Sequence, residues 1–242
     1  MRILFYNPAP AQRRCEPFEA LRGSPFFRRP NYDALRLSYL SRSHQFIYVD
    51  EHIEAWTDVS PDVVVVHVGL TLADYVEKLI ASRWGKDVPT VCYGVYPTLF
   101  PDQTRQFCTS AVIGDIASVW NRLLTDVRKK DLAPVYEAQH AKHFHVDRRI
   151  ETRFGFTPFF SQVRTSFGCE CAEEHRDFCP EAVLYKTPAR SKIETAAENI
   201  ARSTRKTVLM LDDDFLADID FGMHLLERCW RYKKRWIFQA KS

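Results

Sequence analysis

The chain carries the run VVVVHV at residues 63–68, a series of valines with a single histidine. An apolar run of this length without polar alternation is typical of a strand in a parallel sheet that helices cover on both faces. The residues that follow predict such a helix, because apolar side chains recur every three or four positions, at Leu72, Tyr75, Val76, Leu79 and Ile80. The two segments together predict one β/α unit.

Similar units lie on both sides of this one. Further apolar runs that predict strands occur at residues 3–6, 46–50, 88–93 and 111–113. Residues 116–127 repeat the helical spacing. Because strands and helices alternate in this way, we expect residues 1–130 to form a doubly wound, Rossmann-like α/β domain with a five-stranded, mainly parallel sheet.

Residues 131–158 show no sustained period and are predicted to be a linker. Its histidines, at 140, 143 and 145, either bind a metal ion or belong to a solvated loop. The β/α alternation resumes in residues 159–242, with strands expected at 159–165, 207–211 and 236–240. A capping box at residues 191–194 predicts the start of one helix, and a second helix is expected to carry Ile219, Met223, Leu226 and Trp230 on one face. Three strands cannot close a barrel, so we expect this second domain to be incomplete.

Composition narrows the class of protein. The 242 residues are 45% hydrophobic and 27% charged, which excludes disorder as the main state. A net charge of +3 does not favour nucleic acid as a partner. The chain has no apolar stretch near the roughly 18 residues of a membrane span, and its start does not resemble a secretory signal. We therefore expect a cytoplasmic protein without a membrane span.

Three of the seven cysteines, Cys169, Cys171 and Cys179, lie close together in the sequence. Because the total is odd and no secretory signal is present, clustered cysteines indicate metal or redox chemistry rather than disulfides. Three thiolates can hold an iron–sulfur cluster with one open position. With His175 they could instead hold a structural zinc ion, and unliganded thiols are the third alternative.

The residues around these cysteines resemble the cluster loop of radical S-adenosylmethionine (SAM) enzymes. The matching segments are Thr165–Cys169, Phe178–Pro180, Arg190-Ser191 with Glu198, and Leu211–Phe215. In the first half, Tyr93–Pro101 and Ala111–Asp115 with Trp120 resemble the cobalamin-binding domains fused to such enzymes. The segments occur in the same order as in that family, so the chain resembles a cobalamin-binding radical SAM protein.

This resemblance implies three cofactors. A [4Fe–4S] cluster would be held by Cys169, Cys171 and Cys179, and its open iron would bind SAM. Asp212 and Asp213 would meet SAM, although an acidic run at this place can also cap the next helix. The cobalamin contacts implied are Asn7, Pro8, Gly69, Thr71, Gly94, Val95, Pro97 and Thr98. The loops at 94–98 and 169–179 are then expected to open onto one cleft.

The function implied is that of a cobalamin-dependent radical SAM enzyme, with methyl transfer to an unactivated carbon of a small-molecule substrate and an electron donor as partner. Residues 159–242 would be the first part of the radical SAM (β/α) partial barrel, without its C-terminal half. The chain departs from the family at Arg176, which stands where the second cysteine is usual, and at Tyr93 and Tyr96. The alternative is therefore a non-catalytic or vestigial cobalamin-binding module with a degenerate cluster site. A zinc-stabilised α/β protein without a cofactor is a third reading.

Overall fold

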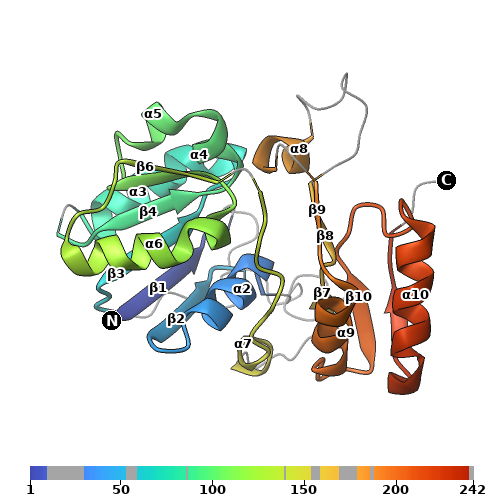
Figure 1. Cartoon of the computed structure of the whole chain (residues 1–242). Helices are drawn as coiled ribbons and strands as arrows, with labels where there is room; N and C mark the ends of the chain where they lie inside the picture. The colour runs from blue at the N-terminus through green and yellow to red at the C-terminus, as the bar shows by residue number, and fades with distance from the viewer. Residues whose placement is uncertain are drawn as a thin grey trace.

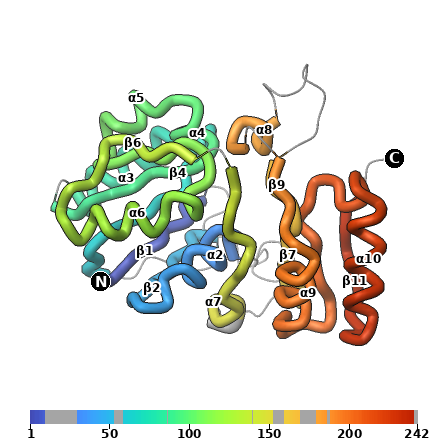
Figure 2. The backbone as a smooth tube through the Cα atoms, viewed as in Figure 1, coloured from blue at the N-terminus to red at the C-terminus, as the bar shows by residue number. Residues whose placement is uncertain are grey.

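The computed structural model describes residues 1–9, 30–52, 59–85, 87–138, 140–153, 159–168, 179–185 and 188–239 (Figures 1 and 2). Within these residues the first half forms a six-stranded sheet in the order β2-β1-β3-β4-β5-β6, and every neighbouring pair is parallel. Its strands are β1 (Arg2–Asn7), β2 (Gln45–Asp50), β3 (Val63–His67), β4 (Thr90–Tyr93), β5 (Ser110–Gly114) and β6 (Val135–Ala138). The expected parallel sheet is confirmed.

The sixth strand, β6, falls in the segment for which the sequence predicted only a linker. Its register with β5 places Tyr136 beside Val112. The Tyr136 ring is buried, and its hydroxyl donates a hydrogen bond to Asp126 at 2.7 Å. A strand of four residues with one buried tyrosine is too short to show an apolar period, which explains why the sequence pattern missed it.

Helices cover both faces of this sheet, as the apolar strands require. On one face, α2 (Tyr32–Leu40) and α6 (Ile116–Lys129) pack against the odd-numbered side chains of β1 and β3. On the other face, α3 (Ala73–Arg83) buries Val76, Leu79 and Ile80. The short helices α4 (Val95–Leu99) and α5 (Pro101–Thr104) follow β4. The strand order reverses between β1 and β3, where open α/β sheets have their ligand-binding crevice.

The second half contains a smaller parallel sheet in the order β11-β10-β7. Its strands are β7 (Phe160–Val163), β10 (Thr207–Met210) and β11 (Arg235–Ile237), joined through α9 (Ile193–Ala201) and α10 (Ile219–Cys229). Two short strands, β8 (Ser166–Phe167) and β9 (Ala189–Arg190), pair antiparallel beside it. The remaining short helices are α7 (Arg149–Arg153) and α8 (Pro180–Leu184). Figure 1 shows the two sheets side by side, with α7 below and α8 above the space between them.

Both expected helices of the second half are present, but the cap of one and the buried face of the other differ from what the sequence patterns suggest. Helix α9 has Lys192 as its N-cap without a side-chain hydrogen bond, and Ser191 instead donates its backbone N–H to the carbonyl of Thr165. Helix α10 buries Leu225 and Cys229, whereas Ile219 is 65% and Trp230 84% exposed. Both faces of α10 carry apolar side chains, so the spacing alone could not indicate which one packs on the sheet.

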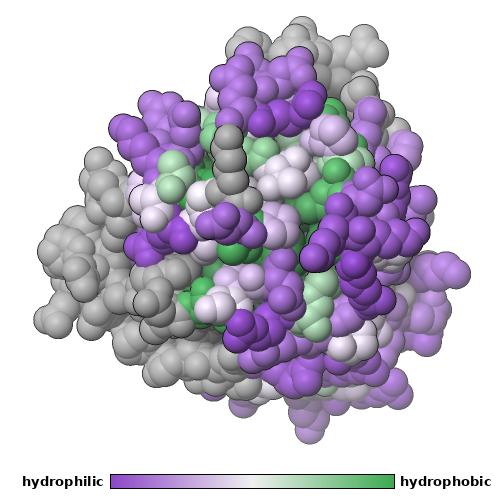
Figure 3. Space-filling model, turned by 90° about the vertical axis from the view of Figure 1, so that its left-hand side faces the viewer, coloured by the Kyte–Doolittle hydropathy of each residue, from purple (hydrophilic) through white to green (hydrophobic). Residues whose placement is uncertain are grey.

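The surface seen from the side of the six-stranded sheet is mostly hydrophilic around a smaller apolar centre (Figure 3). In the part of the chain that the structure describes, no helix has the length and apolar composition needed to cross a membrane.

Candidate functional site

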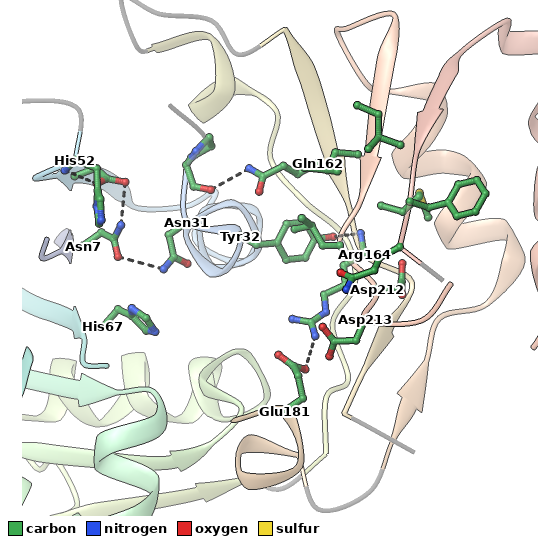
Figure 4. A pocket seen from close by; sticks show the side chains of 18 of the residues that line it. Asn7, Asn31, Tyr32, His52, His67, Gln162, Arg164, Glu181, Asp212 and Asp213 are labelled. Carbon is green, nitrogen blue, oxygen red and sulfur yellow. Dashed lines mark hydrogen bonds and ion pairs between the residues drawn. The ribbon is translucent and has the colours of Figure 1, made fainter. Parts of the chain in front are cut away.

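A cavity of about 830 Å³ lies between the two sheets (Figure 4). One wall is formed by residues at the carboxyl ends of β1, β2 and β3, and the other by the ends of β7, β10 and β11. Parallel α/β sheets bind their ligands at these strand ends, and ligand sites are frequent between domains. The cavity is therefore the candidate site.

The first wall is held together by hydrogen bonds around a buried carboxylate. Asp50, at the end of β2, accepts a hydrogen bond from the Asn7 side-chain amide at 3.0 Å, and a ring nitrogen of His52 lies 2.9 Å from its other oxygen. The Tyr48 hydroxyl also donates to Asp50. Asn31 donates to the Asn7 side-chain oxygen at 3.3 Å. These contacts fix the amide and imidazole groups at the cavity edge.

His67 stands beside this network, at the end of β3. Its ring centroid lies 5.2 Å from that of Tyr93, and burial lowers the pKa of His67 below its usual value. Neither ring nitrogen has a hydrogen-bond or ion-pair partner among the described residues. The lowered pKa favours the neutral imidazole, which lines the cavity with a nitrogen lone pair that no described residue uses.

The second wall carries charged side chains. Arg164, just after β7, forms an ion pair with Glu181, and its guanidinium lies 4.4 Å from the Phe167 ring centroid. Burial raises the pKa of Glu181, although the neighbouring guanidinium acts in the opposite direction. Asp213 lies exposed in the same wall, close enough to Arg164 to interact with it electrostatically. This wall can therefore meet both the amino and the carboxylate group of an amino-acid ligand.

The carboxylate of Asp212 is engaged in hydrogen bonds within the protein. Only 2% exposed, it accepts hydrogen bonds from the backbone N–H of Thr165 at 3.0 Å and from the Ser166 hydroxyl at 2.6 Å. These bonds tie the end of β10 to the end of β7. The helix that follows is capped by Asp218, which accepts from the backbone N–H of Phe221. The alternative in which the run 212–214 caps that helix is wrong.

The structure brings some of the sequence-predicted residues to the cavity. Four of the predicted contacts line it: Asn7, Pro8, Asp212 and Asp213. The lining formed by described residues does not include Gly69, Thr71, Gly94, Val95, Pro97 or Thr98. Thr98 donates its hydroxyl to the Gly94 carbonyl at 2.8 Å, which holds the start of α4 together behind His67.

The predicted cluster ligands can be placed only in part. Cys169 and Cys171 lie outside the described residues. Cys179 is a partly exposed free thiol at the N-cap of α8. Helix α8 packs against α4, so the end of the cysteine loop and the segment 94–98 lie next to each other. Among the described residues, no group of three His, Cys, Asp or Glu side chains is arranged to hold a metal ion.

Sequence reasoning missed several residues of the cavity. Gln162 lies inside β7 and donates to the Pro30 carbonyl at 2.9 Å, and the Tyr32 hydroxyl accepts from the backbone N–H of Arg164 at 3.1 Å. Both contacts join the first half of the chain to the second, and no local sequence pattern predicts them. His67 is marked in the sequence, because it is the polar residue in an otherwise apolar strand.

Two known proteins are similar to part or all of the chain. No protein-family model matches the chain. A segment of 49 residues, 20% of the chain, is 39% identical to the bacteriochlorophyllide d C-12(1)-methyltransferase of Chlorobaculum tepidum, and it spans 11% of that protein. The fold is similar to that of the cobalamin-dependent S-adenosylmethionine radical enzyme OxsB with aqua-cobalamin bound, with a TM-score of 0.62 and 15% identity. That match covers 98% of this chain and 38% of the enzyme.

The described residues fit part of the cofactor set of such an enzyme. The cavity volume is within the range of about 300–1,000 Å³ usual for ligand sites. Asn7 offers a hydrogen-bonding amide and His67 a metal-ligating imidazole, both suited to a corrinoid with its peripheral amides. Arg164 and Asp213 offer the charges suited to the amino-acid end of SAM. The cluster has a single predicted ligand, Cys179, within the described residues.

Proposed function

We propose that this chain is the cobalamin-binding domain and the first barrel units of a cobalamin-dependent radical SAM enzyme that transfers a methyl group to an unactivated carbon. The observation that carries the proposal is the cavity in which the carboxyl ends of two parallel sheets face each other. One sheet has the doubly wound order and the other consists of successive β/α units. The fold similarity to a solved cobalamin-dependent radical enzyme supports the same assignment.

In this proposal each wall of the cavity binds a different cofactor. When bound, cobalamin would supply the methyl group, while SAM at the cluster would supply the radical with an electron from a donor. Asn7 binds the corrinoid side, and Asp213 with Arg164 binds the SAM side. Ile237 and Phe238, which line the second wall and are 39% and 41% exposed, give the site an apolar surface for a small-molecule substrate. An apolar surface also keeps water away from a reactive carbon.

A second candidate is a cobalamin-binding module without catalysis. One feature favours it: Arg176 stands where the radical SAM family has its second cysteine. A guanidinium cannot replace a thiolate as an iron ligand, because it is always protonated and has no acceptor. In this alternative Cys169, Cys171 and Cys179 hold no cluster, and the first wall alone keeps its function.

Anaerobic reconstitution separates the two candidates. The protein is incubated with iron, sulfide and hydroxocobalamin, desalted, and analysed for cobalt, iron, sulfide and its visible spectrum. The enzyme proposal predicts cobalamin together with a cluster whose iron is lost when either Cys169 or Cys179 is replaced by alanine. Replacement of Cys92, a buried cysteine of β4, is the matched control and should leave the iron unchanged. Cobalamin without iron favours the module, and the absence of both contradicts the proposal.

A further inference from the structure

The ring of His67 is the feature of the cavity that the proposed function has not yet used. It lies at the end of β3, next to the reversal of strand order, and Figure 4 shows it directed into the space between the two walls. The other polar groups of this wall, on Asn7, Asp50 and His52, are engaged with one another. Among the described residues, the His67 ring contacts Tyr93 and packs against Gly94 without a hydrogen bond to a ring nitrogen.

We propose that His67 supplies an axial nitrogen ligand to the cobalt of the corrinoid, from the side of the six-stranded sheet. This inference rests on the proposed binding of cobalamin. A corrin ring takes up the equatorial positions of cobalt and leaves the axial positions open. A neutral imidazole is the side chain best suited to fill one of them.

The surroundings of His67 keep its ring in the ligating form. It is partly buried, and the charged or titratable groups that act on it are Asp33 of α2 together with Asp50 and His52 of the first wall. Burial outweighs the two carboxylates, so the pKa of His67 stays below its usual value and the lone pair is available near pH 7. Coordination would then require no loss of a proton.

The backbone behind the ring is shaped to receive it. Gly94 has a φ of +119°, and a Cβ atom at this position would lie 3.2 Å from the His67 Nε2 and 2.8 Å from the Val68 carbonyl oxygen. The imidazole therefore occupies the space that a side chain at 94 would need. With Tyr93 on one side and Gly94 behind, the ring has little freedom to turn away from the cavity, which favours a ligand of defined direction.

His52 provides the matched control. It lines the same cavity, but its ring is tied to Asp50 at 2.9 Å and its side chain is 25% exposed. If any histidine near the corrinoid produced the same signal, the variant His67→Ala would keep it. If only His67 coordinates cobalt, then His52→Ala keeps the signal and His67→Ala loses it.

The probe is cobinamide reduced to Co(II), because this corrinoid lacks the dimethylbenzimidazole base whose nitrogen would give the same signal. The unpaired electron of low-spin Co(II) lies along the axial direction, so an axial ¹⁴N splits each cobalt line of the electron paramagnetic resonance spectrum into a triplet. We expect triplets in the parent protein and in His52→Ala, doublets after labelling with ¹⁵N-histidine, and unsplit lines in His67→Ala. Circular dichroism confirms that each variant is folded.

The outcomes distinguish this inference from the proposed function. Bound cobinamide without nitrogen splitting in the parent, or triplets that persist in His67→Ala, would overturn the ligand assignment and leave cobalamin binding intact. If no corrinoid binds to the parent, the proposed function itself fails. If His67→Ala no longer retains cobinamide, added ¹⁵N-imidazole should restore binding with doublets in the vacated site, and failure of this rescue counts against His67.

Discussion

The Nε2 atom of His67 lies where a side chain at position 94 would have to go, because a Cβ atom on Gly94 would approach it to 3.2 Å. The same Cβ would come within 2.8 Å of the Val68 carbonyl oxygen, which cannot move without disturbing the end of β3. Gly94 also has a φ of +119°, a backbone region that other residues rarely adopt. Two adjacent strand ends, of β3 and β4, are thus fitted to each other beside the cavity.

We expect Gly94→Ala to lower the free energy of unfolding by about 2–3 kcal/mol, because the new methyl group meets backbone and the positive φ is strained. Chemical denaturation measures this change. Gly69→Ala is the control, since the nearest atom to its Cβ would be Leu72 Cδ1 at 4.0 Å and no positive φ is involved. It should change stability by less than about 0.5 kcal/mol. Equal effects in the two variants would contradict the packing described for His67 and Gly94.

The second prediction concerns the buried ion pair between α2 and the end of β5. Arg36 is fully buried and contacts Asp115 at 2.8 and 3.1 Å. Asp115→Ala leaves a guanidinium without its main partner, so we expect a loss of about 3–5 kcal/mol in unfolding free energy. The exposed pair of Arg105 and Asp102, 3.8 Å apart, is the comparison. Asp102→Ala should have an effect below about 1 kcal/mol. A small effect of Asp115→Ala would show that the pair contributes little.

The third prediction is a pH dependence from Asp147. Burial alone would raise the pKa of Asp147, but hydrogen bonds from Arg149 and from the Ser38 hydroxyl outweigh it and lower the pKa below its usual value. A lowered pKa in the folded state adds stability above the unfolded pKa of about 4, and this contribution is lost as the pH falls further. The stability difference between the parent and Asp147→Asn should therefore be constant near neutral pH and shrink below about pH 4. A difference that does not vary with pH would refute this role.

A fourth prediction follows from the orientation of α10. Leu225 is fully buried and Trp230 is 84% exposed. We expect Leu225→Ala to destabilise the fold by about 2–5 kcal/mol, and Trp230→Ser to change its stability by less than about 0.5 kcal/mol. Thermal or chemical unfolding of the two variants gives the comparison. A large loss of stability in Trp230→Ser would indicate that the face of α10 suggested by the sequence pattern is the one that packs in the core.

The sequence was sufficient for the parallel sheet, because the apolar runs around Val63 and Ala111 have no polar alternation and the helical stripes between them are regular. It was not sufficient for β6, whose four residues carry no period, or for α10, which is apolar on both faces. The apparent capping box at Ser191 failed because the backbone there is engaged with Thr165.

The residues of the candidate site were predictable only where they directly follow a recognisable strand. Asn7 and Pro8 come directly after a recognisable strand, and Asp213 follows another, so their place at the sheet edge could be inferred. Tyr32, Gln162 and Arg164 reach the cavity because the two halves dock through hydrogen bonds such as that from Gln162 to the Pro30 carbonyl. Docking of this kind depends on tertiary contacts far apart in the sequence, which no local pattern records.

The central claim is that the cavity between the two sheets is the cobalamin site, and equilibrium titration with hydroxocobalamin tests it most directly. Asp213→Trp adds a large ring at an exposed residue that lines the cavity just after β10. Asp102→Trp, at a side chain that is 89% exposed on α5, is the control for adding a tryptophan elsewhere. We expect the parent and Asp102→Trp to bind with equal affinity and Asp213→Trp to bind at least about tenfold more weakly, a difference of about 1.4 kcal/mol. Equal binding by all three folded proteins, or no binding by the parent, would contradict the account.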